Sequence, residues 1–306
     1  MGIERKDRGW SNGRGTDHSR NREFSHKFSA PSGLLRRMIG RNRATMAGLV
    51  IVCLFLGVAA LAPILTHYDP ERPDLAVVLR PPSLAHPFGT DEMGRDVLTR
   101  VFYGARVSLR VIVVTLTIAG AVGVFVGALS GYAGGAVDEV LMRLTDAFLA
   151  FPALILTLAI GAALGPSIEH AMAAVGAVWW PLYARLTRGQ VLALKDEEFV
   201  EAARSLGLSP LRIVLRHILP NTMTPLIVQL TLDVGAVILT TAGLSFVGVG
   251  AQPPLPEWGL MVSTGRIYLQ HQWWVGLFPG LAIFLVALGF NLLGDGLRDW
   301  LDPEDK

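Results

Sequence analysis

The sequence has little charge and almost no cysteine. Only 17% of its 306 residues are charged, 27 basic and 25 acidic, whereas an ordinary soluble protein carries about 25% charge. The one cysteine, Cys53, excludes an internal disulfide. This composition argues against a disordered, collagen-like or disulfide-rich secreted chain, and it makes a soluble enzyme an unfavourable interpretation.

Familiar motifs for nucleotide and metal binding are also missing. The chain has no G-x-x-x-x-G-K-[ST] phosphate loop and no H-E-x-x-H or C-x-x-C pattern. We therefore expect no catalytic residue, no bound metal and no cofactor in this chain. If it moves a solute uphill, the energy must come from a partner or from an ion gradient.

Long apolar runs take the place of the missing charge. A membrane helix needs about 20 mainly apolar residues. Six runs meet or approach this length: 44–66, 111–137, 141–164, 168–184, 222–246 and 275–294. The first is too long, and too far from the N-terminus, for the apolar core of a signal peptide. We expect an all-α, polytopic membrane protein with six transmembrane helices.

The runs predict the organisation of the chain. It comprises a basic tail (1–43, with 1–33 expected to be disordered), a first transmembrane helix (44–66), an outer loop (67–105), a core of five transmembrane helices (106–298) and a C-terminus (299–306). The tail carries 11 Lys/Arg and 4 Asp/Glu. A basic arm could bind nucleic acid, but before a membrane helix it favours a cytoplasmic flank, so we expect no nucleic acid partner. With both termini cytoplasmic, inside segments hold 19 Lys/Arg and outside segments 5.

Two features inside the apolar runs are informative: a glycine repeat and one acidic residue. Gly123, Gly127, Gly131 and Gly135 repeat every four residues, a spacing that lets another helix approach closely.

Asp233 is the main candidate for a charge inside a span. A centred Asp costs about 2.5–3.5 kcal/mol on insertion scales, and such residues usually face the bundle interior or a water-filled path. Asp233 could line or gate the translocation path, but an interhelical hydrogen bond is the favoured alternative.

The predicted inner loop 195–221 indicates two short helices. Asp196 is placed to cap the first and Gly207 to end it, while Ser209 and Pro210 start the second and Pro220 ends it. The first helix has an apolar face and exposes small residues, which suits docking into a groove of another protein. Its acidic start disfavours the alternative of an anionic lipid surface.

These residues carry a family resemblance. Glu201-Ala202-Ala203-x3-Gly207, followed by Leu219-Pro220, resembles the EAA loop of ABC-importer permeases. The usual Ile two residues before Leu-Pro is His217 here. Segments 86–96, 104–109, 216–221, 243–246 and 291–298 resemble, in the family's order, the second (C-type) permease subunit of dipeptide, oligopeptide and nickel importers. The resemblance covers residues 34–303.

The resemblance implies a type I importer permease in a bacterial or archaeal plasma membrane, with both termini cytoplasmic. Its partners would be a companion permease in a heterodimer, two ABC ATPases that hold ATP and Mg, and an extracytoplasmic substrate-binding protein. Di- or oligopeptides are the expected substrates; related permeases serve nickel, glutathione and other small solutes. An ATP-independent carrier or channel with Asp233 for ion coupling, and a membrane enzyme, are disfavoured alternatives.

The resemblance also implies roles for particular residues. The helix in 195–221 would be a coupling helix seated in an ATPase. Its contact would be made or shaped by Glu201, Ala202, Ala203 and Gly207, with Arg204, Leu206 and Pro210 as weaker additions. On the outer face, candidates for docking the binding protein or packing against the companion permease are Gly89, Asp91, Gly94, Arg95 and Asp96.

Overall fold

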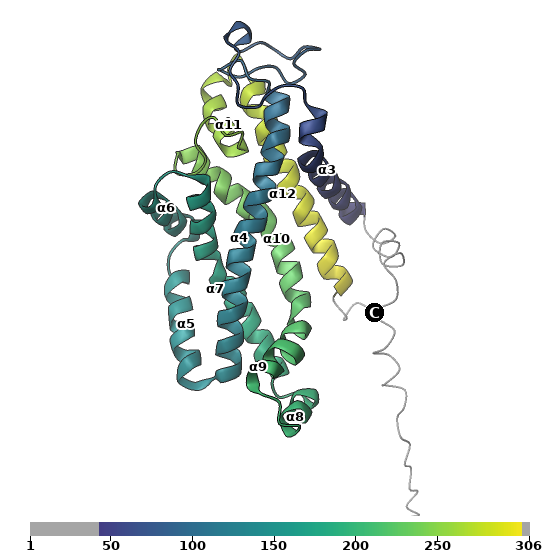
Figure 1. Cartoon of the computed structure of the whole chain (residues 1–306), viewed down its shortest axis with the longest axis vertical. Helices are drawn as coiled ribbons and strands as arrows, with labels where there is room; N and C mark the ends of the chain where they lie inside the picture. Colours follow the sequence, from purple (N-terminus) through teal and green to yellow (C-terminus); the bar gives the residue numbers. More distant parts are fainter. Residues whose placement is uncertain (1–42, 302–306) are drawn as a thin grey trace, which may run out of the picture. The chain divides into compact units, whose positions relative to one another are not determined.

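The structure is a computed structural model that describes residues 43–301, and its regular elements are helical (Figure 1). The long helices are α3 (Arg43–Leu65), α4 (Val97–Ala133), α5 (Gly135–Leu149), α6 (Ala153–Leu164), α7 (Ile168–Leu194), α10 (Leu219–Val247) and α12 (Trp274–Leu301). The short ones are α8 (Glu198–Ser205), α9 (Pro210–Ile213) and α11 (Trp258–Gly265), with a π-helical turn at Val214–Ile218 and 3₁₀ turns at Leu75–Val77 and Arg266–Tyr268. The all-α prediction is confirmed for this range. Most of the predicted tail, and residues 302–306, lie outside it.

Four helices in the described range are long and apolar enough to cross a membrane. These are α3, α4, α12 and the continuous stretch Pro210–Val247; a fifth is added if α5 and α6 together count as one span. The remaining predicted span, 168–184, lies in α7, which has 27 residues but is not among the helices that qualify. Six helical segments therefore occur where six were predicted, and four or five of them qualify as spans by length and composition.

The third predicted span, 141–164, is not one straight helix. α5 and α6 are bent by 89° at the break between them. Pro152, at the N-cap of α6, explains the break: proline has no backbone N–H and disfavours a helical conformation in the residue before it. The run predicted as the third span is therefore divided between two helices.

The predicted outer loop 67–105 is shorter than expected because α4 begins at Val97. Asp96 starts the helix: its carboxylate accepts hydrogen bonds from the backbone N–H and the hydroxyl of Thr99, both at 2.8 Å. An Asp at this position satisfies a donor that the first helical turn leaves free. We call the remaining non-spanning segment, residues 66–96, the cap. It lies at the opposite end of the bundle from α8 (Figure 1).

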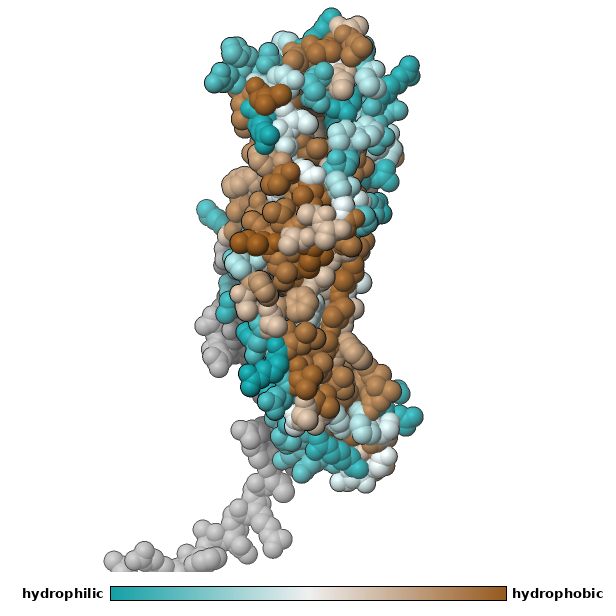
Figure 2. Space-filling view, turned by 90° about the vertical axis from the view of Figure 1, so that its left-hand side faces the viewer, coloured by the Kyte–Doolittle hydropathy of each residue, from teal (hydrophilic) through white to brown (hydrophobic). Residues whose placement is uncertain are grey.

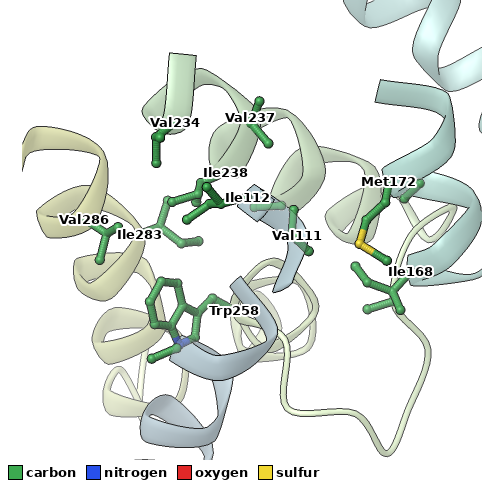
Figure 3. Close-up of a cluster of buried hydrophobic side chains, with 14 of the residues drawn as sticks. Val111, Ile112, Ile168, Met172, Val234, Val237, Ile238, Trp258, Ile283 and Val286 are labelled. Atoms are coloured by element: carbon green, nitrogen blue, oxygen red, sulfur yellow. The ribbon is translucent and has the colours of Figure 1, made fainter. Parts of the chain in front are cut away.

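The main hydrophobic core lies between α3, α4, α7, α10, α11 and α12, and Figure 3 shows part of it. Trp258 of α11 is buried among aliphatic side chains of α4, α10 and α12. Its indole N–H donates to the carbonyl of Val101 at 2.9 Å, and a Cβ on Gly104 would overlap with its ring. A buried indole needs such a hydrogen-bond acceptor, so this contact fixes α11 against α4.

The glycine repeat packs α4 against α7. A Cβ on Gly123, Gly127 or Gly131 would overlap with atoms of α7, so the two helices touch along this strip. Gly135 does not belong to it: it lies beyond the end of α4, with φ +54° and no atom near its Cβ position. The strip has three glycines instead of the four predicted, because α4 ends at Ala133 with Gly134 as its C-cap.

The surface of the bundle matches a membrane environment. Figure 2 shows apolar side chains over the middle of one face and hydrophilic ones at its two ends. Exposed apolar residues include Leu54 and Ile64 of α3, Phe125 of α4, Leu154 and Ile155 of α6, and Phe284 of α12. Such a continuous apolar surface is too large for a soluble monomer.

Candidate functional site

α8 is ended by a left-handed glycine, as the sequence predicts. Gly207 has φ +74°, a conformation that glycine adopts without steric cost. The N–H of Gly207 donates to the carbonyl of Arg204 at 2.9 Å, and the N–H of Leu208 donates to that of Ala203 at 3.2 Å. These two bonds make a Schellman motif. At the other end the cap position is Glu197, with no side-chain cap bond, so the expectation that Asp196 caps the helix is wrong.

One face of α8 is anchored on the bundle. Val200 and Ala203 are buried in a small second core. The members of this second core are Ala128 of α4, Val191 of α7, Val200 and Ala203 of α8, Ile213 of α9 and Ile218. The guanidinium of Arg204 lies 5.8 Å from the ring centre of Tyr132, a cation–π distance. Ala203 therefore shapes the position of α8 but offers little surface to another protein.

The opposite face of α8 is not covered by the part of the chain that the structure describes. Glu201, Ala202 and Gly207 are exposed, and Leu206 is 81% exposed. Phe199 is also exposed, whereas its neighbour Val200 is buried. An apolar patch beside acidic residues, at the end of the bundle away from the cap (Figure 1), is a suitable surface for a protein partner.

The turn after α8 leads into a second helix, as predicted. Pro210 is the first residue of α9, with Ser209 at the N-cap but without a side-chain cap bond. Pro220 does not end the helix, contrary to expectation. It lies in the first turn of α10, which continues to Val247. A proline is tolerated there because the first N–H groups of a helix have no intrahelical partner.

Asp233 is buried between two helices. It is 8% exposed, and it accepts a hydrogen bond from the Tyr183 hydroxyl at 2.7 Å and from Gln229 Nε2 at 3.0 Å. Both carboxylate oxygens thus have a partner. This geometry corresponds to the interhelical hydrogen bond that the sequence favours over a path-lining role.

The five candidates in the cap are all buried within this chain: Gly89, Asp91, Gly94, Arg95 and Asp96. Asp91 accepts from Arg95 Nε at 2.7 Å and lies 3.4 Å from Arg100 Nε. Asp96 lies 3.0 Å from His86 Nδ1. Their side chains hold the cap together and are not displayed for docking. Met93, in the same segment, is exposed.

The two glycines of the cap are required by its backbone. Gly89 has φ +73° and Gly94 has φ +74°. A Cβ on Gly89 would overlap with the Trp274 ring, and one on Gly94 with the carbonyl of Asp74. The cap therefore folds back closely on itself and on α12.

Comparison with known proteins identifies the family. Residues 123–304 match a family described as the inner membrane component of binding-protein-dependent transport systems. Residues 32–82 match a family described as the N-terminal transmembrane domain of oligopeptide transport permease C. The chain belongs to these binding-protein-dependent transport permeases.

Similar permeases cover most of the chain. A probable D,D-dipeptide transport system permease of Escherichia coli K12 is 47% identical over 267 residues, 87% of this chain and 90% of the relative. A dipeptide transport system permease of Alkalihalophilus pseudofirmus is 45% identical over 270 residues, 88% and 89% of the two chains. A glutathione transport system permease of Escherichia coli O6:K15:H31 is 44% identical over 271 residues, again 88% and 89%.

A solved structure supports the fold. The permease matches a chain of the MetNI methionine ABC transporter in an inward-facing conformation, with a TM-score of 0.53 and 17% identity. The match covers 67% of the permease and 98% of that chain. The type I importer fold is thereby confirmed, and the permease is a multi-pass inner-membrane protein.

One charged cluster of the permease could not be predicted from the sequence. Arg188 of α7 binds Asp138 of α5 with two hydrogen bonds of 2.6 Å, and the Ser130 hydroxyl of α4 donates to the same carboxylate. The sequence does place opposite charges at the ends of its apolar runs. It gives no indication, however, of which charges pair when they are 50 positions apart. In the described part of the permease, no three His, Cys, Asp or Glu side chains gather as a metal site.

Proposed function

We propose that this permease forms half of the translocation path of an ATP-driven importer for di- and oligopeptides. The supporting observation is the 45–47% identity, over nearly the whole chain, to relatives named for dipeptide and D,D-dipeptide transport. Glutathione, named for another relative, is itself a peptide. Uptake of glutathione is therefore the second candidate.

The proposal assigns four partners. A companion permease completes the path as a heterodimer, two ABC ATPases supply the energy and bind ATP and Mg, and an extracytoplasmic binding protein delivers the substrate. α8 is the coupling helix, and its exposed residues Glu201, Ala202 and Leu206 contact an ATPase, while Gly207 and Pro210 fix its orientation. Both termini are cytoplasmic in this arrangement, and the cap faces outside.

The burial of the five cap candidates refines the docking proposal. Asp91, Arg95 and Asp96 act through the shape of the cap, and the exposed Met93 is a candidate for direct contact with the binding protein. Asp233 holds α7 to α10 and is not the ion-coupling residue that an ATP-independent carrier would need.

Uptake of labelled di- and oligopeptides, with glutathione and nickel in parallel, tests the proposal in a strain that lacks this gene and redundant importers. We expect peptide uptake to be lost, and restored by the wild-type gene but not by Gly207→Pro, because proline cannot adopt φ +74°. Unchanged peptide uptake would contradict the substrate, and normal uptake by Gly207→Pro would contradict the coupling role of α8.

A further inference from the structure

The chain between α9 and α10 passes through a π-helical turn, Val214–Ile218. The N–H of Leu219 donates to the carbonyl of Val214, five residues earlier, instead of four. A π-turn contains one residue more than the corresponding α-helical turn, and such turns are rare and concentrated at functional sites.

Pro220 explains why the turn widens here. In an α-helix, residue 220 would donate to the carbonyl of Arg216, but proline has no N–H and its ring crowds that carbonyl. The next carbonyl, that of His217, accepts from the side-chain amide of Asn221 at 2.6 Å. The sequence thus removes one α-helical bond of this turn and adds a side-chain bond to a neighbouring carbonyl.

The widened turn also orients two buried side chains. Ile213 is 1% exposed and Ile218 is 0% exposed, and both belong to the second core. In an α-helix, at about 100° per residue, two residues five apart would point about 140° from each other. The additional residue of the π-turn brings both to one side, while Leu215 and Arg216 between them remain exposed.

The π-turn lies where the chain leaves one core and enters the other. Before it, α8 and α9 pack in the second core with α4 and α7. After it, α10 contributes Leu226, Val234 and Val237 to the main core. The strip of Gly123, Gly127 and Gly131 holds α4 closely against α7. In the second core α8 packs with this pair of helices, with α9 and with the π-turn that leads into α10.

We propose that the π-turn Val214–Ile218 is the joint at which α8 and α9 change their angle to α10 during transport. This inference rests on the proposed function, because it requires an ATPase to displace α8. A change from five-residue to four-residue hydrogen bonds turns Ile218 relative to Ile213, so the second core repacks at this turn while the main core keeps its packing. Such a joint lets α8 and α9 change their angle to α10 while α4 stays packed on α7.

Pro220→Ala tests the joint, with Pro225→Ala as the matched control. Both prolines lie in α10, but only for Pro220 does the carbonyl four residues earlier lie in the π-turn. The variants are compared in the complete transporter in liposomes, by labelled dipeptide taken up per ATP hydrolysed. Alanine at 220 supplies the missing N–H and favours a regular α-helix, so we expect this ratio to fall about tenfold. The ratio of the control should stay within about twofold of wild type. Equal ratios for the wild type and the two variants would contradict the proposed joint.

Hydrogen exchange of the wild-type transporter gives a second test that does not depend on a variant. We compare the nucleotide-free complex with the vanadate-trapped complex. Amides in 214–221 should exchange at different rates in the two states, and those in 123–133 and 183–194 at equal rates. Equal exchange rates of residues 214–221 in the two states would contradict the proposed joint. If the proposed function fails instead, the wild-type transporter will take up no peptide or will retain no ATPase.

Discussion

The hydroxyl of Tyr183 in α7 donates a hydrogen bond to Oδ2 of Asp233 in α10, at 2.7 Å. Gln229 donates to the other carboxylate oxygen at 3.0 Å. A buried polar group with all its partners in place stabilises a structure, but leaving one partner unpaired costs about 1–3 kcal/mol. The contact therefore gives α7 and α10 a specific alignment within an apolar bundle.

Tyr183→Phe should lower the free energy of unfolding by about 1–3 kcal/mol, since Asp233 loses one donor in a buried place. A fall in Tm of the detergent-purified permease measures this. Tyr268→Phe is the control, because no side-chain hydrogen bond joins the Tyr268 hydroxyl to any of residues 43–301. Asp233→Asn keeps the shape of the side chain, and this variant should keep most of the wild-type uptake activity. If it abolishes transport without lowering Tm, Asp233 has a role in the translocation path.

Gly207→Ala should reduce peptide uptake several-fold without loss of the permease from the membrane. An L-residue at φ +74° costs about 1–2 kcal/mol, and α8 can relieve the strain only by changing its orientation. Gly243→Ala is a matched control, because neither glycine has an atom within 4 Å of its Cβ position, and Gly243 is helical. Uptake per ATP measures coupling, and an equal effect of both substitutions would contradict the role of Gly207.

Local chemistry predicted the features that depend on a few neighbouring residues. The end of α8 at Gly207 and the start of α9 at Pro210 follow from backbone preferences alone, and both occur as expected. Pro220 was misinterpreted because a proline suits either a position after a helix or the first turn of the next one. Which applies depends on the tertiary packing around Pro220, where Ile218 and Leu219 join the second core, and a single sequence does not reveal that packing.

The direction in which the cap side chains point could not be predicted from the sequence. Asp91 and Asp96 appear as polar residues in a loop, for which exposure is the usual expectation. They are buried because distant residues complete the cap: the Trp274 indole donates to the carbonyl of Thr90 at 3.1 Å, and Arg100 to that of Pro254 at 3.2 Å. These contacts span more than 150 positions, and no local pattern encodes them.

Gly94→Ala should open the cap, whereas Gly165→Ala should only strain a turn. Both glycines have positive φ, +74° and +92°, so each substitution costs about 1–2 kcal/mol of backbone strain. Only at Gly94 would the Cβ also overlap with a carbonyl, that of Asp74. Limited proteolysis in membrane vesicles should therefore cleave residues 66–96 faster in Gly94→Ala alone. Equal protection of both variants would show that the cap relaxes around the added methyl group.

The Asp138–Arg188 pair should couple α5 to α7 more strongly than an exposed ion pair can. Its two side chains are 19% and 33% exposed, and two hydrogen bonds of 2.6 Å join them. Arg143 and Glu139 form the control pair, at 3.7 Å with 78% and 71% exposure. Exposed pairs contribute about 0.2–1 kcal/mol and removing one partner of a buried pair costs about 3–5 kcal/mol, so we expect an intermediate coupling energy at Asp138–Arg188.

A double-mutant cycle of thermal stability measures both pairs in the same detergent. Asp138→Asn and Arg188→Gln each remove one charge, and their combination should be less destabilising than the sum of the two. The corresponding cycle for Glu139 and Arg143 should be additive. If the first cycle is also additive, the pair does not hold α5 on α7, and the attachment of α5 rests on its other contacts with α7, the Asp146–Arg185 ion pair and the packing of Phe148 on Trp180.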